Sequence, residues 1–91
     1  MNTNVREYAV RRVVTVFDKD TEEFITFFTL QNFTLHEYIY WFDVPQDDPF
    51  MYDFYEISPV NAHIMADEDI LFDFDRNIYY VECSQVVEMY E

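Results

Sequence analysis

The stretch EYAVRRVVTVFDKDTEEFITFFTLQ, residues 7–31, decides the fold class of this chain. Its first part, residues 7–17, is rich in β-branched and aromatic side chains and predicts a β-strand. Residues 18–23 are polar, with aspartates at favourable positions for a turn. Residues 24–31 are apolar again and predict a second strand, so the whole stretch indicates a β-hairpin.

Both predicted strands carry apolar residues on both of their faces. Successive side chains of a strand point to opposite faces, so Val14 and Val16 fall on one face while Val13 and Phe17 fall on the other. A sheet that is apolar on both faces needs cover on both. We therefore expect helices on one face and long side chains or a partner on the other.

Downstream of the hairpin the sequence predicts two short helices. Thr34 is followed three residues later by Glu37, which is the capping-box pattern, and this helix should end near Asp43. Ser58 and Pro59 are typical of a second helix start, and that helix should run to about residue 66.

Three more strands are expected, over residues 52–57, 69–74 and 77–90, the last two joined by a turn at residues 75–77 in which Asn77 can adopt a left-handed conformation. The order β-β-α-β-α-β-β predicts one α+β domain over residues 1–91, with a small, mainly antiparallel β-sheet and two short helices.

The charge is large and uneven. The chain has 91 residues and a formal net charge of −14; residues 1–19 are net positive, and Arg76 is the one basic residue after them. Such a domain repels nucleic acid and anionic membranes and attracts basic partners. The sequence lacks an apolar signal core at its start and an apolar run of membrane-spanning length. We therefore expect a cytoplasmic protein that binds neither nucleic acid nor membrane directly.

Candidate catalytic groups are few. Cys83 could pair with His36 or His63, but an inert cysteine on a buried strand is the commoner outcome. The chain has no glycine, so it has neither a Gly-rich phosphate loop nor the glycines of a nucleophile elbow. We expect no enzymatic activity and no cofactor.

The sequence DFDRN, residues 73–77, begins like a calcium-binding loop. Asp73, Asp75 and Asn77 alternate as ligands would, but Ile78 replaces the required glycine and Ser84 the required glutamate. A polar hairpin turn is the favoured interpretation, and we expect no metal site.

Carboxylates and aromatic rings are interleaved in DVPQDDPFMYDFYEI, residues 43–57. Rings that anchor and carboxylates that complement a basic surface are typical of a protein interface. A second acidic run follows at residues 67–69. The candidate partner-binding residues are Trp41, Asp47, Asp48, Tyr52, Asp53, Tyr55, Glu56, Asp67, Glu68 and Asp69.

Three segments resemble a known family when taken together: VFDKDTEEFI (16–25), DDPFMYDFYEISP (47–59) and FDFDRNIYYVECSQ (72–85). They are similar to segments of small acidic immunity proteins from bacterial polymorphic-toxin systems, including contact-dependent growth inhibition. Phe50 is an insertion relative to that pattern. The resemblance implies a cytoplasmic inhibitor that binds one toxin domain tightly, and it does not nominate contact residues.

Two functions are therefore expected as alternatives. The first is an immunity protein that forms a 1:1 complex with a basic toxin domain, with an RNase favoured, and occludes its active-site cleft. The second is a nucleic-acid mimic that inhibits host or phage machinery, as anti-restriction and anti-CRISPR factors do. The interleaved aromatic residues favour the first, since a mimic spreads its carboxylates at phosphate-like spacing.

Overall fold

The predicted hairpin is present in the computed structural model, which describes residues 10–85. The elements in chain order are β1 (Val10–Asp18), β2 (Phe24–Thr29), α1 (Leu35–Trp41), β3 (Tyr55–Glu56), α2 (Pro59–Ile64), the 3-10 turn η1 (Ala66–Glu68) and β4 (Asn77–Gln85). The α+β class with two short helices is confirmed. Residues 7–9 and 86–90, which were assigned to the first and last strands, lie outside the described residues.

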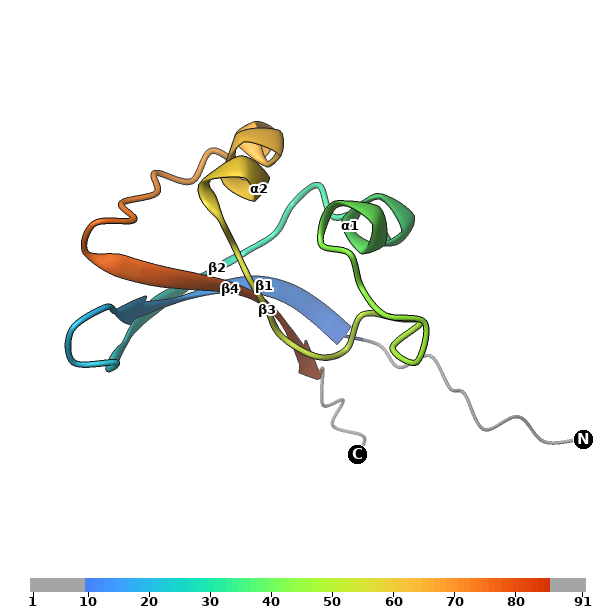
Figure 1. The fold of residues 1–91 in the computed structure, drawn as a ribbon, viewed down its shortest axis with the longest axis horizontal. Helices are drawn as coiled ribbons and strands as arrows, with labels where there is room; N and C mark the ends of the chain where they lie inside the picture. Colours follow the sequence, from blue (N-terminus) through green and yellow to red (C-terminus); the bar gives the residue numbers. More distant parts are fainter. Residues whose placement is uncertain (1–9, 86–91) are drawn as a thin grey trace, which may run out of the picture.

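The sheet has the strand order β2-β1-β4-β3, and every pairing in it is antiparallel. β1 lies at the centre: Val14 is opposite Phe28 of β2 on one side and Val81 of β4 on the other. Figure 1 shows α1 and α2 on the same side of this sheet. The sheet therefore has one face toward the helices and one face away from them, and we call the latter the open face.

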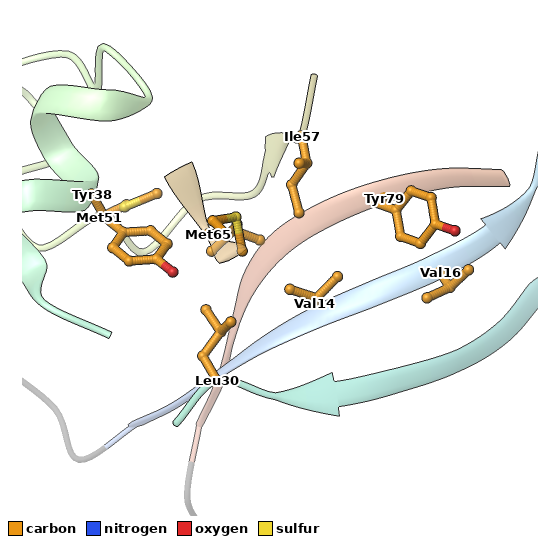
Figure 2. Packing of buried hydrophobic residues seen from close by; sticks show 9 residues of the cluster. Val14, Val16, Leu30, Tyr38, Met51, Ile57, Met65 and Tyr79 are labelled. Atoms are coloured by element: carbon orange, nitrogen blue, oxygen red, sulfur yellow. The ribbon is translucent and has the colours of Figure 1, made fainter. Parts of the chain in front are cut away.

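The core lies between the helices and the sheet. Val14 and Val16 of β1 and Tyr79 and Val81 of β4 are the buried residues of the sheet's helix side. Figure 2 shows them with the buried side chains that the rest of the chain contributes, which are Leu30, Tyr38, Ile57, Met51 and Met65.

The predicted strand over residues 69–74 is not formed. Its apolar residues do alternate, with Phe72 and Phe74 packed against the core and Leu71 95% exposed. However, one edge of β4 pairs with β1, and the other edge pairs with β3. The Ile57 N–H, directly after β3, donates to the Tyr79 carbonyl of β4 at 2.8 Å. Neither edge of β4 is therefore open to residues 69–74. The segment therefore packs without pairing. The strand expected over 52–57 is likewise only two residues long.

The two helix starts differ from each other. Ser58 forms a full capping box with Asn61, and Pro59 stands in the first turn, as expected. The capping box expected at Thr34 is absent: its side chain makes no cap hydrogen bond, and the helix begins with the Tyr38 N–H donating to the Thr34 carbonyl at 3.0 Å. The burial of Tyr38, which is 2% exposed, holds α1 in place instead.

Among residues 10–85, four adopt the left-handed conformation without being glycine: Glu22, Asp43, Met51 and Asp69. The two aspartates tolerate this backbone readily, whereas glutamate and methionine do so at a cost of about 1 kcal/mol. Asn77 is not among them, because it begins β4 in register with Asp18 of β1.

Candidate functional site

Arg12 holds the acidic loop, residues 43–53, against the sheet. It lies on the helix side of β1, and its Nη1 and Nη2 each donate a hydrogen bond of 2.8 Å, to the carbonyls of Met51 and Phe50 respectively. Its guanidinium also lies 4.5 Å from the centre of the Phe33 ring. Such a fork is specific to arginine. Phe50 thus supplies one of the two carbonyls that Arg12 binds.

Asp48 organises the turn within the acidic loop. Its Oδ2 accepts a 2.6 Å hydrogen bond from the Tyr55 hydroxyl, and its Oδ1 accepts one of 2.8 Å from the Tyr52 N–H. Burial raises the pKa of the Asp48 carboxyl, but these hydrogen bonds, with one from the Asp53 N–H, outweigh burial and leave the pKa below its usual value. Burial and the neighbouring Asp48 raise the pKa of Tyr55. This carboxylate therefore already has partners inside the chain.

The other candidates around residues 41–56 are placed differently from one another. Asp47, Asp53 and Glu56 are exposed. Trp41 is half-buried and packs against the core, with its ring 5.2 Å from that of Tyr38. Tyr52 is also half-buried. The structure thus brings Asp48, Tyr52, Asp53 and Tyr55 into one cluster, and leaves Trp41 and Glu56 outside it.

In the second acidic run, residues 67–69, Glu68 is buried and hydrogen-bonded within the chain. Glu68 is 8% exposed, and its two carboxylate oxygens accept hydrogen bonds from the N–H groups of Gln31 (2.8 Å) and Asn32 (2.7 Å). It therefore anchors the segment that follows β2. Asp67 and Asp69 on either side are exposed.

A row of aromatic rings crosses the open face, and sequence reasoning did not identify it as a site. Phe24 of β2 lies 5.9 Å from Phe17 of β1, Phe17 lies 5.8 Å from Tyr80 of β4, and Tyr80 lies 5.4 Å from Phe54, all edge to face. We call these four residues the aromatic row. Its end members, Phe24 and Phe54, are 57% and 59% exposed. In the described part of the chain, both helices lie on the other side of the sheet (Figure 1).

The open face is hollowed beside this row. A hollow of about 460 Å³ is lined by the three rings of Phe17, Phe54 and Tyr80 together with Ile78, Glu22 and Glu82. We call it the aromatic hollow. A smaller one of about 260 Å³ lies on the other side of Glu82, among residues that include Arg11 and Phe27. In the sequence, Val13 and Phe17 already indicated that the second face of the first strand is apolar, and this was the available signal for the open face.

Cys83 lies on β4 directly opposite Arg12. Its Sγ donates a hydrogen bond to the Met51 carbonyl at 3.3 Å, and burial raises the pKa of its thiol. A raised pKa disfavours the nucleophilic thiolate at neutral pH. His36 and His63 are exposed on α1 and α2.

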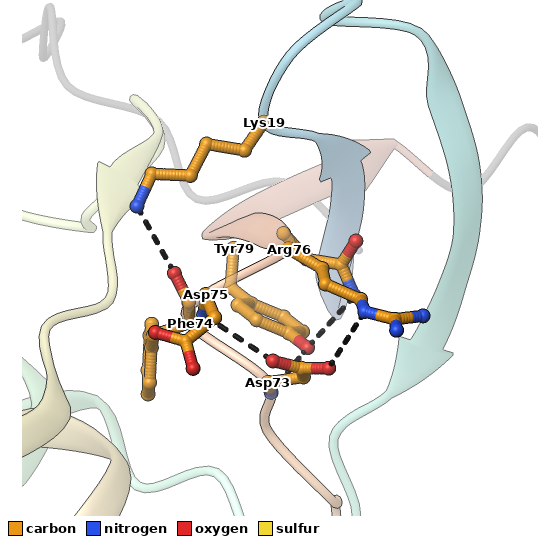
Figure 3. A network of polar contacts seen from close by, with 7 residues as sticks. Lys19, Asp73, Phe74, Asp75, Arg76 and Tyr79 are labelled. Atoms are coloured by element: carbon orange, nitrogen blue, oxygen red, sulfur yellow. Dashed lines mark hydrogen bonds and ion pairs between the residues drawn. The ribbon is translucent and has the colours of Figure 1, made fainter.

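The calcium-like sequence at residues 73–77 forms a tight turn (Figure 3). Asp73 Oδ1 accepts a hydrogen bond from the Asp75 N–H at 3.2 Å, and its carbonyl accepts one from the Asn77 N–H at 3.0 Å. The Tyr79 hydroxyl accepts the Asp73 N–H at 2.8 Å, and Lys19 Nζ donates to the Phe74 carbonyl at 3.2 Å. Over residues 10–85 as a whole, no group of three or more His, Cys, Asp or Glu residues could hold a metal ion.

Over residues 10–85, these features define a small acidic α+β domain with one aromatic sheet face that no helix covers. The chain belongs to the family described as a domain of unknown function (DUF7683), whose model matches residues 11–82. No curated protein and no solved structure matches the chain. Within the described residues, none of the helices has the length and apolar character needed to cross a membrane.

Proposed function

We propose that this protein is an immunity protein: a cytoplasmic inhibitor that binds a basic toxin domain in a 1:1 complex and occludes its active-site cleft. A nuclease is the favoured target, and among nucleases an RNase. Such clefts are lined with Lys, Arg and His that grip phosphates, and a protein with a net charge of −14 complements them.

The main support for this proposal is the aromatic row of a strongly acidic domain, on a sheet face that no helix in residues 10–85 covers. Large exposed apolar patches on small proteins mark interaction surfaces, and aromatic residues are the usual anchors of interfaces. Charge would speed the encounter with a basic partner, and the rings would give the contact its lifetime.

The alternative function, nucleic-acid mimicry directed at host or phage machinery, shares the charge. It is less well supported, because a phosphate backbone has no counterpart to a row of exposed rings. The carboxylates of Asp48 and Glu68 are also held by hydrogen bonds inside the chain, so they add little to a phosphate-like array.

The test is co-expression of the full chain with the product of each neighbouring reading frame, followed by co-purification and titration calorimetry. We expect one neighbour to encode a basic domain that binds 1:1 with a Kd below about 1 μM, or roughly 8 kcal/mol or more of binding free energy. The chain should block cleavage of an RNA substrate by that domain in stoichiometric amounts. The association rate should fall as salt rises from about 0.05 to 0.5 M.

Two outcomes would overturn the proposal. One is that no neighbouring product binds at micromolar concentration. The other is that a neighbour binds but its toxicity and its catalytic activity are unaffected by a molar excess of the chain.

A further inference from the structure

We infer that the aromatic hollow binds an arginine side chain of the partner protein, so that the open face, and not the acidic loop, is the central contact surface. This inference rests on the proposed function, since it takes the partner to be a basic protein. It adds the surface and the chemical group that this surface recognises.

The rings give the hollow its affinity for a cation. Phe17 and Phe54 lie on either side of Tyr80, with interplanar angles of 76° and 81° to it. A guanidinium inserted there meets the face or edge of three rings within one hollow of about 460 Å³. Cations are attracted to the electron-rich faces of aromatic rings, and arginine, which is planar and weakly hydrated, stacks on them best.

Two carboxylates give the hollow its charge. Glu82 is fixed in orientation because its Oε2 accepts a 2.7 Å hydrogen bond from the Thr15 hydroxyl. Its Oε1 accepts no hydrogen bond from any residue that the structure describes. Glu22, in the β1–β2 turn, also lines the hollow. A guanidinium in the hollow can donate to Glu82, and such charge-assisted hydrogen bonds are the strong ones. Glu56 stands opposite Tyr80 in register and adds a third carboxylate at the edge.

The negative charge of the hollow favours a basic partner over a second copy of the chain or a nucleic acid. A second copy of the chain would bring another net charge of −14 to a face with three carboxylates, and nucleic acid would bring phosphates to them. The acidic loop is a weaker candidate for the central contact. Its Asp48 carboxylate already accepts hydrogen bonds from the Tyr55 hydroxyl and two backbone N–H groups.

The test begins with a probe that needs no partner. Acetyl-Gly-Arg-Gly-amide is titrated into the full-length protein by NMR, with the citrulline peptide, which has the same shape without the charge, as control. We expect saturable millimolar binding that shifts the ring signals of Phe17, Phe54 and Tyr80, and at least ~5-fold weaker binding of the citrulline peptide. Phe54→Ala and Glu82→Gln should each weaken arginine binding about 3- to 10-fold. Asp47→Asn, which removes one charge from the acidic loop, should weaken it less than 2-fold.

Several results would overturn the inference. One is equal binding of both peptides; another is shifts confined to residues 43–53. A third is a dimer, seen by light scattering, that Phe54→Ala dissociates, because the occupant is then a second copy. Nuclear Overhauser contacts between the aromatic row and residues outside 10–85 would assign the face to the chain's own ends. If the partner binds the wild-type chain and the Phe54→Ala and Glu82→Gln variants equally, the inference fails while the proposed function stands. If no partner binds the wild type, the proposed function fails first.

Discussion

Comparing Arg12→Ala with Arg11→Ala separates the effect of the contacts that Arg12 makes from the effect of losing one positive charge. Arg12 and Arg11 are neighbours on β1, and the alternation of the strand points them to opposite faces. Arg12 donates two 2.8 Å hydrogen bonds to loop carbonyls, whereas Arg11 is exposed on the open face. Either alanine variant changes the net charge from −14 to −15, so the difference between them isolates the contacts.

The magnitude follows from those contacts. A hydrogen bond from a charged donor contributes about 1.5–3 kcal/mol, and a cation–π contact such as that with Phe33 about 0.5–1 kcal/mol. Arg12 is only half-buried, so water recovers part of this, and we expect Arg12→Ala to lower the free energy of unfolding by about 3 kcal/mol. Arg12→Lys keeps the charge but not the fork and should lose about 1.5 kcal/mol. Arg11→Ala should stay within about 0.5 kcal/mol of wild type.

Urea unfolding followed by the fluorescence of Trp41, the single tryptophan, measures all three variants. In thermal unfolding, each kcal/mol should lower Tm by roughly 4–8 °C for a domain of this size. Hydrogen exchange should also show faster opening of residues 48–52 in Arg12→Ala than in Arg11→Ala. Equal losses for the two alanine variants would refute the reasoning, because charge alone would then account for both.

Three further substitutions, one of them with a matched control, test other parts of the structure. Tyr55→Phe removes the 2.6 Å hydrogen bond to Asp48 and should cost about 1 kcal/mol at pH 7. The pKa of Asp48 is lowered in the folded protein, so the stability that Asp48 contributes is present above its ordinary pKa near 4 and is lost as pH falls through the folded pKa. An equal difference in urea midpoint between wild type and Tyr55→Phe at pH 7 and at pH 2.5 would contradict this. Glu68→Gln leaves one of two backbone N–H groups without its acceptor and should cost about 2 kcal/mol, whereas exposed Asp67→Asn should change the urea midpoint little. Glu22→Gly should raise Tm slightly, by roughly 0.5 kcal/mol of stability, since φ is 64° there and glutamate is strained at a positive φ. A lowered Tm would show that no strain is relieved.

Local patterns in the sequence predicted most of the fold. The hairpin, the Ser58 cap and the antiparallel α+β class follow from side-chain alternation and cap chemistry, which act between residues close in sequence. The strand expected at 69–74 shows the limit of such patterns. Its alternation is real, and Phe72 and Phe74 do pack inward. Pairing, however, depends on which strand edge is free, and that is decided by segments distant in sequence.

The candidate site was harder to predict for the same reason. Charge and ring content pointed to residues 43–57, but a carboxylate whose partners lie within the chain looks the same in sequence as an exposed one. Asp48 is held in this way and Asp47 is exposed. The rings of the aromatic row come from positions 17, 24, 54 and 80, and only the strand register brings them together. The apolar second face of the first strand was the signal in the sequence for this surface, which we expected long side chains or a partner to cover.

The central position of β1 has a consequence for how the chain reaches its folded state. β1 pairs along its whole length with β4, so that Val10 lies opposite Gln85. Contacts this far apart in sequence form slowly, because a long loop must close before they are gained. Without β4, a hairpin of β1 and β2 would have apolar residues on both faces and no core. An isolated hairpin is marginally stable at best in water, and exposed apolar faces and strand edges favour aggregation. A nascent chain that stops before residue 77 would lack β4, and with it Tyr80 and Glu82. The fold and the aromatic hollow can therefore form only after β4 has been synthesised.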